Sequence, residues 1–202
     1  MITYLNNSDS LIIVLHEIYG INKHIRKVCE YYSLAGFDVI CPNLLNTNKI
    51  FEYSDEENAY QYFMKNVGFD LAYKKVENIL LQFRHQYKRI FILGYSIGAT
   101  VAWLCNDGDI RCDGIIGYYG SRIRDYSNIN SKYETLLIFP DNEKSFNVDD
   151  LICNLNEKSN VNAYKFCGRH GFCDTYSANF DAKSYKEADR LVSNFINRVI
   201  KK

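Results

Sequence analysis

The 202-residue sequence lacks the features that mark several classes of protein. Its 24 basic and 24 acidic side chains cancel to a formal net charge of zero, so there is no excess of positive charge for nucleic acid or a membrane surface. No segment approaches the ~20 consecutive apolar residues of a membrane span. The N-terminus has neither the basic region nor the apolar core of a signal peptide. We therefore expect a cytoplasmic protein with no nucleic-acid or membrane partner.

Proline is scarce, and the cysteines do not form metal-binding patterns. Only Pro42 and Pro140 occur, and no low-complexity linker or internal repeat divides the chain, so we expect a single domain over residues 1–202. The seven cysteines include no Cys-x-x-Cys pair, and no histidine lies at zinc-finger spacing. Reduced, mostly buried thiols and no metal site are the expectation.

What the sequence does contain is an alternation of short apolar runs with longer amphipathic segments. The runs predict strands at Leu11–Leu15, Phe37–Cys41, Ile90–Leu93, Gly114–Tyr118, Thr135–Phe139 and Val161–Phe166. Helices are predicted at 22–35, 56–66, 70–85, after Gly98, and at 147–158 and 184–200. In the helix at 70–85, Leu71 is expected on the apolar face. This order predicts an α/β fold: a mostly parallel sheet with helices on both faces and right-handed crossovers.

A nucleophile elbow is the most specific motif. Gly94-Tyr95-Ser96-Ile97-Gly98 has the form G-x-S-x-G, with an apolar strand before it and an apolar helical segment after it. In this context the motif holds a serine in a sharp strand-to-helix turn of an α/β-hydrolase fold. The amide groups at the start of the following helix then favour a developing oxyanion. We therefore predict that Ser96 is a nucleophile.

A serine nucleophile needs a base, and the chain has four histidines. His24 and His85 fall in helical patterns and are expected at the surface. His16 follows the first strand but precedes Ser96, whereas this fold places the histidine last, after the serine and the acid. His170 fits that order and lies in a glycine-containing loop just after the last predicted strand. His170 is therefore the predicted base.

Two carboxylates can supply the acid, because both follow the strand at Thr135–Phe139. Asp141 and Glu143 each stand where an acid could orient the histidine. Asp141 also lies in a good turn sequence and so has a possible structural role. Spacing does not choose between them.

Four sequence blocks resemble the dienelactone hydrolase family of α/β-hydrolases, and together they extend over nearly the whole chain. They are the segment His16-Glu17-Ile18-Tyr19-Gly20 with its continuation to Arg26, the segment Gly36–Leu44, the elbow, and Gly117-Tyr118-Tyr119-Gly120. The loop His170-Gly171-Phe172 also fits the family.

The resemblance implies roles for individual residues. Ser96 would be the nucleophile and His170 the base. Laid without gaps on the family's G-x-x-D segment, Glu143 takes the place of the acid, with Asp141 as the alternative. The backbone N–H groups of Ile97 and Ile18 would form the oxyanion hole.

Other residues near the predicted site take supporting roles. By the same resemblance, Glu17 would hydrogen-bond the nucleophile in the resting enzyme; its alternative role is that of a buried structural carboxylate. Aromatic side chains flanking the strand ends are candidates for pocket lining or for plain packing: Tyr19, Tyr95, Tyr118, Tyr119 and Phe172.

Two departures from the family bear on the substrate. Ser96 stands where many dienelactone hydrolases carry cysteine. Asp174 stands where the dienelactone-specific enzymes carry an arginine that binds the substrate carboxylate, and an aspartate there would repel an anion. The chain has no insertion large enough for a substantial lid, so little or no lid is expected.

The sequence thus predicts a serine hydrolase for small esters, lactones or thioesters that needs no cofactor. A non-catalytic scaffold that binds a ligand or partner, and an acyl transferase or peptidase on the same fold, remain alternatives. Either a monomer or a homodimer is compatible with the sequence.

Overall fold

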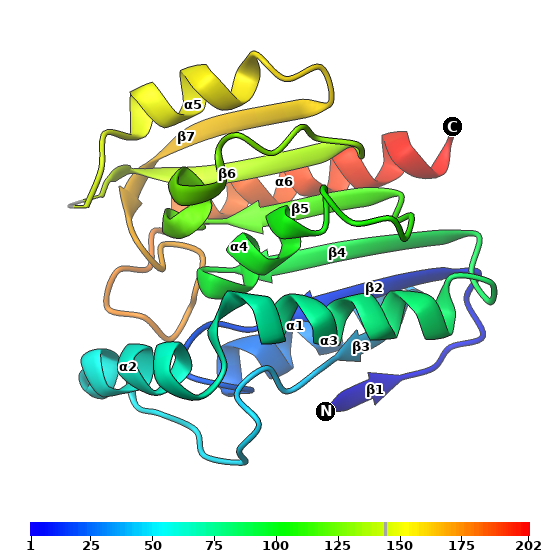
Figure 1. Cartoon of the computed structure of the whole chain (residues 1–202), viewed down its shortest axis with the longest axis horizontal. Coiled ribbons are helices and arrows are strands. Elements are labelled where there is room, and N and C mark those ends of the chain that lie inside the picture. The colour runs from blue at the N-terminus through cyan, green and yellow to red at the C-terminus, as the bar shows by residue number, and fades with distance from the viewer. Residues whose placement is uncertain (144) are drawn as a thin grey trace.

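A mostly parallel sheet forms the centre of the protein (Figure 1). The computed structural model describes residues 1–143 and 145–202. In that part of the chain the sheet has seven strands in the order β1-β3-β2-β4-β5-β6-β7. All neighbours pair in parallel except β1, which is antiparallel to β3. The strands are β1 (Ile2–Tyr4), β2 (Ser10–Leu15), β3 (Asp38–Cys41), β4 (Arg89–Tyr95), β5 (Gly114–Tyr118), β6 (Thr135–Asn142) and β7 (Val161–Arg169).

Helices cover both faces of this sheet. They are α1 (Lys23–Leu34), α2 (Glu56–Asn66), α3 (Gly68–Phe83), α4 (Ile97–Leu104), α5 (Val148–Asn156) and α6 (Ala182–Ile200), with 3₁₀ turns η1 (Tyr53–Asp55) and η2 (Ser121–Tyr126). Helices α1 and α6 pack on one face, and α3, α4 and α5 pack on the other. No helix in the described ranges combines the length and apolarity needed to cross a bilayer.

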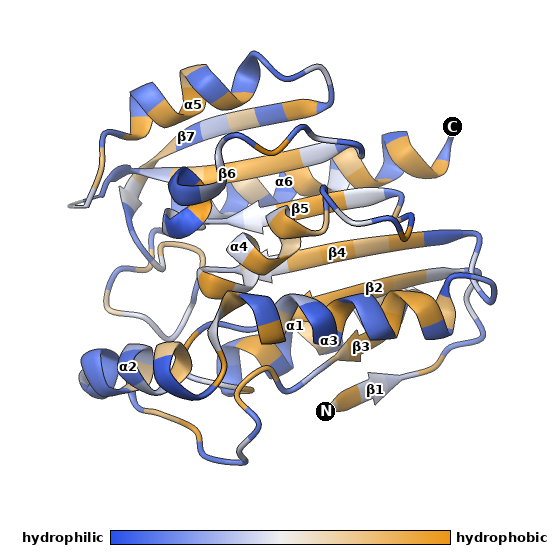
Figure 2. Cartoon of the chain, viewed as in Figure 1, coloured by the Kyte–Doolittle hydropathy of each residue, from blue (hydrophilic) through white to orange (hydrophobic). Residues whose placement is uncertain are grey.

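Side-chain alternation along the strands explains the two layers. In β2, Leu11, Ile13 and Leu15 belong to the cluster under α3 and α4. Ile12 and Val14 belong to the cluster under α1 and α6. Because successive side chains of a strand point to opposite faces, a strand buried on both sides must be apolar throughout. Figure 2 shows this as hydrophobic colouring over the middle of β2 and β4.

The structure confirms the predicted α/β-hydrolase fold class and the position of every predicted strand and helix. Strands β6 and β7 run three residues further than predicted, to Asn142 and Arg169. Three short elements, β1, η1 and η2, were not expected, because a three-residue edge strand and short 3₁₀ turns leave no periodic pattern. The placement of Leu71 on the apolar face was wrong: it is 51% exposed, because α3 begins at Gly68 and buries Phe69 and Ala72 instead.

A buried histidine ties the end of β2 to the loop after β3. The His16 Nδ1–H donates to the backbone oxygen of Glu17 at 2.6 Å, and Nε2 accepts from the backbone N–H of Leu44 at 2.8 Å. His16 is fully buried, and burial lowers its pKa to about 4. A second proton would remove the acceptor that Leu44 needs, so this histidine serves the fold in its neutral form.

The His16 contacts predict an acid-dependent loss of stability. Between about pH 6.5 and pH 4, His16 is protonated in the unfolded chain but stays neutral in the folded chain. The contribution is therefore complete above pH 6.5 and is lost as the pH falls toward 4, by up to about 3 kcal/mol. In urea denaturation at a series of pH values, His16→Gln should lose most of that pH dependence.

His85→Gln is the matched control, because His85 is exposed. It should keep the pH dependence of the wild type. Parallel stability curves for wild type and His16→Gln would contradict the assignment.

Candidate active site

The turn between β4 and α4 presents Ser96 at the carboxyl ends of the strands. Ser96 has φ 53° and ψ −115°, a left-handed conformation that a non-glycine residue rarely adopts. A Cβ on Gly94 would collide with the backbone of Gly98, and a Cβ on Gly98 would collide with the backbone of Leu15, each within 3.0 Å. The Ser96 N–H donates to the Tyr118 oxygen at 2.9 Å. Glycine at both positions therefore lets the turn close tightly between β2 and β5.

His170 lies against Ser96 and Glu143. The imidazole Nε2 is 2.9 Å from Ser96 Oγ, and Nδ1 is 2.7 Å from Glu143 Oε1. The three residues are far apart in the sequence and come from three loops at the same edge of the sheet, following β4, β6 and β7. Such an arrangement lets a carboxylate orient an imidazole that accepts the serine proton.

The two candidate acids have different contacts. Glu143 hydrogen-bonds His170, and its side chain is 9% exposed. Asp141 is exposed and accepts the backbone N–H of Gly168 at 2.9 Å. Asp141 thus joins the end of β6 to the glycine that precedes the histidine loop, where Gly168 has φ 135°. The structure brings Glu143, and not Asp141, to the imidazole.

The electrostatic surroundings of His170 favour its charged form. Burial alone would lower the pKa of His170, but the hydrogen bond and negative charge of Glu143 outweigh it and leave the pKa above its usual value. Glu17 and Glu56 raise the pKa further. An imidazolium formed by proton transfer from Ser96 would therefore be stabilised.

Glu17 is a buried carboxylate beside these groups. It is 3% exposed, and its Oε2 has no hydrogen-bond partner among the described residues. Burial, reinforced by the negative charge of Asp174, raises the pKa of Glu17 to about 7, although His170 opposes the shift. No hydrogen bond joins Glu17 to Ser96 in residues 1–143 and 145–202; the Ser96 hydroxyl pairs with His170.

The two backbone N–H groups predicted to form the oxyanion hole belong to residues at the carboxyl ends of β2 and β4. Ile97 is the first residue of α4, and Ile18 follows the end of β2. Within the described chain, neither N–H donates to a protein acceptor. Free donors at a helix N-terminus suit a negatively charged oxygen.

The predicted aromatic residues pack closely at this end of the sheet. Tyr95, Tyr118, Tyr119 and Phe172 are all buried in the layer under α1 and α6. The Tyr119 ring centroid lies 4.9 Å from that of His170, and Tyr95 stacks on Tyr118 at 4.7 Å. Tyr19 is half-buried and contacts Tyr53 edge-on at 4.8 Å. Of these five aromatic residues, Tyr119 therefore contacts the predicted base His170. Tyr19 instead contacts the exposed ring of Tyr53.

The expectation that His24 lies at the surface was wrong. His24 is 4% exposed; its ring meets Tyr95 edge-on at 4.8 Å, and its Nδ1 lies 3.6 Å from Asp174 Oδ1. Its spacing from Ile25, Val28 and Tyr32 places it at the edge of the apolar stripe of α1, a signal the sequence already held. Asp174 is itself 1% exposed, and it accepts the Tyr53 hydroxyl at 2.5 Å, a partner that sequence reasoning missed.

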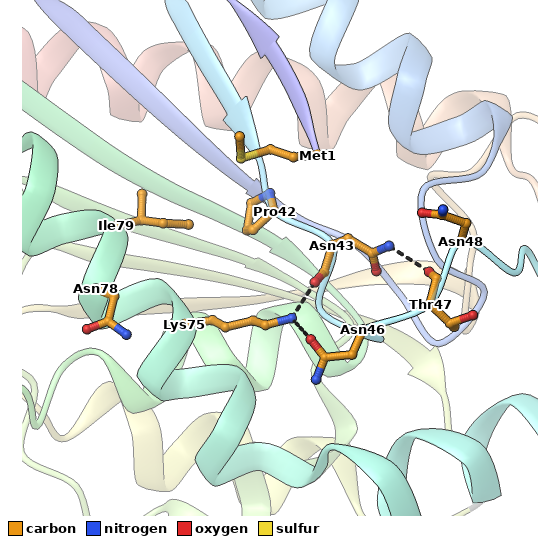
Figure 3. Close-up of a pocket in the computed structure, with 9 residues that line it drawn as sticks. All are labelled: Met1, Pro42, Asn43, Asn46, Thr47, Asn48, Lys75, Asn78 and Ile79. Atoms are coloured by element: carbon orange, nitrogen blue, oxygen red, sulfur yellow. Dashed lines mark hydrogen bonds between the residues drawn. The ribbon is translucent and has the colours of Figure 1, made fainter.

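The pocket in Figure 3 lies apart from these residues. It measures about 470 Å³, and its lining includes Asn43, Asn46 and Lys75 but neither Ser96 nor His170. The Lys75 ammonium donates to the Asn43 oxygen at 2.7 Å and to the Asn46 side chain. Lys75 therefore holds the loop after β3 and is not aimed at the Ser96 site. Among the described residues, no three His, Cys, Asp or Glu side chains are grouped to hold a metal ion.

Comparisons with known proteins identify a relative and solved structures that this chain resembles. The chain is 35% identical over 186 residues to the uncharacterized protein YczH of Bacillus subtilis, covering 91% of each chain. A provisionally named dienelactone hydrolase from Klebsiella pneumoniae superposes with a TM-score of 0.77 at 18% identity, over 92% of this chain and 86% of that one. A dienelactone hydrolase-like promiscuous phosphotriesterase, P91, from metagenomic libraries superposes with a TM-score of 0.72 at 11% identity, over 94% and 86%.

The two superpositions establish the fold, and the family follows from the sequence itself. The family model described as "Dienelactone hydrolase family" matches residues 2–200, nearly the whole chain. The chain belongs to the dienelactone hydrolase family.

Proposed function

We propose that this protein is a serine hydrolase that cleaves small esters, lactones or thioesters. The observation that carries the proposal is the hydrogen-bonded series Glu143–His170–Ser96, with distances of 2.7 and 2.9 Å. Membership of a hydrolase family supports the reaction class. The strained backbone of Ser96 is a second support, because strain of this kind is retained where function requires it.

The first half of the reaction forms an acyl-enzyme. His170 Nε2 accepts the Ser96 proton while Oγ attacks the substrate carbonyl, and the carbonyl π electrons move onto oxygen. The N–H groups of Ile97 and Ile18 stabilise that oxyanion. The imidazolium, held by Glu143, then protonates the leaving alcohol, thiol or ring oxygen as its bond to the acyl carbon breaks.

The second half repeats these steps with water. His170 takes a proton from a water molecule, the hydroxyl adds to the acyl carbon, and the Ser96–acyl bond breaks as Ser96 regains its proton. Every step uses side chains, backbone N–H groups and water. The reaction therefore calls for no metal or organic cofactor, and a small ester-type substrate is the proposed partner.

Glu17 is proposed to tune the nucleophile. Its pKa of about 7 makes it a carboxyl group that changes charge near neutral pH beside His170. Its buried Oε2 has no hydrogen-bond partner among residues 1–143 and 145–202, so it can accept a proton or a hydrogen bond from a group entering the site. A carboxylate at this position would also stabilise the His170 imidazolium that forms during proton transfer.

A non-catalytic scaffold and an acyl transferase are the competing functions. A scaffold gains no support from an imidazole hydrogen-bonded on both sides, because a binding surface has no need of that arrangement. An acyl transferase would use the same acyl-enzyme and would differ in the acceptor, so product analysis in water separates it from a hydrolase.

Replacing the nucleophile gives the first test of function. A fluorophosphonate probe should label the wild type covalently, and peptide mass spectrometry should place the label on Ser96. Ser96→Ala should take up no label and should lose the hydrolysis of short aryl esters down to the uncatalysed rate. Folded wild-type protein that stays unlabelled would refute a serine hydrolase.

Replacing each of the two carboxylates by its amide tests which one orients His170. Glu143→Gln removes the charge that stabilises the His170 imidazolium, so kcat/KM for an aryl ester should fall by about 10²–10⁴-fold. Asp141→Asn keeps an acceptor for the Gly168 N–H and should change kcat/KM by no more than about threefold. The two variants are matched in chemistry, each replacing a carboxylate by its amide. The reverse order of effects would assign the acid to Asp141.

A further inference from the structure

The groups around Ser96 and His170 carry an unusual balance of charge. Glu143 is paired with His170, but Glu17 and Asp174 are also buried here, at 3% and 1% exposure. In the described part of the chain, no lysine or arginine lies within ion-pair distance of any of the three. Glu56 adds a fourth carboxyl group whose charge acts on both Glu17 and His170.

Both carboxylate oxygens of Asp174 accept hydrogen bonds. The Tyr53 hydroxyl donates to Oδ2 at 2.5 Å, and the backbone N–H of Tyr176 donates to Oδ1 at 2.8 Å. Hydrogen bonds to a carboxylate are charge-assisted, so these two donors hold the Asp174 oxygens in place. His24 Nδ1 lies 3.6 Å away, but burial lowers the pKa of His24, so it adds little positive charge. The negative charge of Asp174 is therefore not cancelled locally.

This carboxylate is connected to the reacting residues through short contacts. His24 joins Asp174 to Tyr95, the residue before Ser96. The negative charge of Asp174 also reaches Glu17, whose pKa it helps to raise. Because these groups are buried, water screens their field weakly, and it extends to a ligand at Ser96.

Aromatic rings stand between these charges and solvent. Tyr53 is 36% exposed, yet its hydroxyl reaches the buried Asp174. Tyr19 is half-buried and meets the Tyr53 ring edge-on at 4.8 Å. Aromatic faces backed by a carboxylate attract cations and neutral apolar groups, and they offer a carboxylate ligand no donor pair.

We propose that this site accepts acyl groups that carry no negative charge and prefers a cationic acyl group over an anionic one, with Asp174 as the specificity-determining residue. The inference rests on the proposed hydrolase function and names its substrate class. It follows from the burial of Glu17 and Asp174, from the hydrogen bonds to both oxygens of Asp174, and from the rings of Tyr19 and Tyr53.

A series of three substrates that share a three-methylene acyl chain and differ in its terminal group tests the proposal. They are the para-nitrophenyl esters of trimethylammoniobutyric acid, of valeric acid and of glutaric acid (as the monoester), so the acyl end is cationic, neutral or anionic. After subtraction of the uncatalysed rate, kcat/KM should be at least about tenfold higher for the cationic than for the anionic ester, equivalent to about 1.4 kcal/mol. The neutral ester should lie between them. An anionic ester cleaved as well as the cationic one would overturn the proposal.

Asp174→Asn identifies the source of the preference. The amide keeps an oxygen for the Tyr53 hydroxyl but removes the charge, so the ratio of cationic to anionic kcat/KM should fall severalfold. A purely structural role for Asp174 would change all three substrates by the same factor and leave that ratio unchanged, which would overturn the assignment. Asp9→Asn is the matched control: Asp9 precedes β2 at the other end of the sheet, pairs with Lys88, and should not alter the ratio.

The outcomes separate this proposal from the function on which it rests. If no ester of the series is cleaved in a Ser96-dependent manner, the hydrolase function fails. If the valeric ester is cleaved and Ser96→Ala abolishes that cleavage, the function stands, and the charge series alone decides the substrate class. Should Asp174→Asn fail to fold, the wild-type series still gives that decision.

Discussion

The close approach of Gly98 to the backbone of Leu15 is the contact on which the rest of the site depends. A side chain at either elbow glycine would separate α4 from the ends of β2 and β4. With both glycines present, the first turn of α4 sits directly against the residues that leave β2. This contact fixes α4, which begins at Ile97, against the segment that leaves β2 and contains Ile18, although about eighty residues separate the two in the sequence. The strain at Ser96 is tolerated because three parallel strands, β2, β4 and β5, fix the chain on both sides of it.

The histidine loop is positioned by a different device, the prolonged pairing of β6 with β7. Their register continues to Asn142 and Arg169, past a bulge near Pro140. Asp141 accepts the Gly168 N–H across this extension. The pairing sets the distance between the two strand ends, and so it delivers Glu143 and His170 to each other at 2.7 Å. Asp141 thus hydrogen-bonds the backbone of the histidine loop, and Glu143 hydrogen-bonds the imidazole itself.

The sequence was sufficient to predict strands β2 to β7 and the chain order of the site residues, because apolar runs and the elbow are local patterns. Which of Asp141 and Glu143 contacts His170 depends on where β6 ends, and no local sequence pattern marks that point. The extra residues of β6 are exposed and have no apolar signature, so the strand end could not be located from the sequence. The surroundings of His24 and Asp174 were also out of reach, since Tyr53 lies 121 positions from Asp174. Hydropathy predicts that a residue is buried; it does not identify the polar partner that makes burial of a charge possible.

His16 and His170 lie at the same edge of the sheet, yet their surroundings drive their pKa values in opposite directions. His16 faces a backbone carbonyl and a backbone N–H, so one tautomer satisfies both and a second proton is excluded. His170 faces a carboxylate on one side and a hydroxyl on the other, so its charged form gains a strong partner and its neutral form retains an acceptor for the Ser96 proton. His16 therefore stays neutral and joins two backbone segments, whereas the contacts of His170 suit both its neutral and its charged form. The negative charge of Glu17 raises the pKa of His170, and that of Asp174 raises the pKa of Glu17. The carboxyl groups that favour positive charge around this site would therefore also disfavour an anionic substrate.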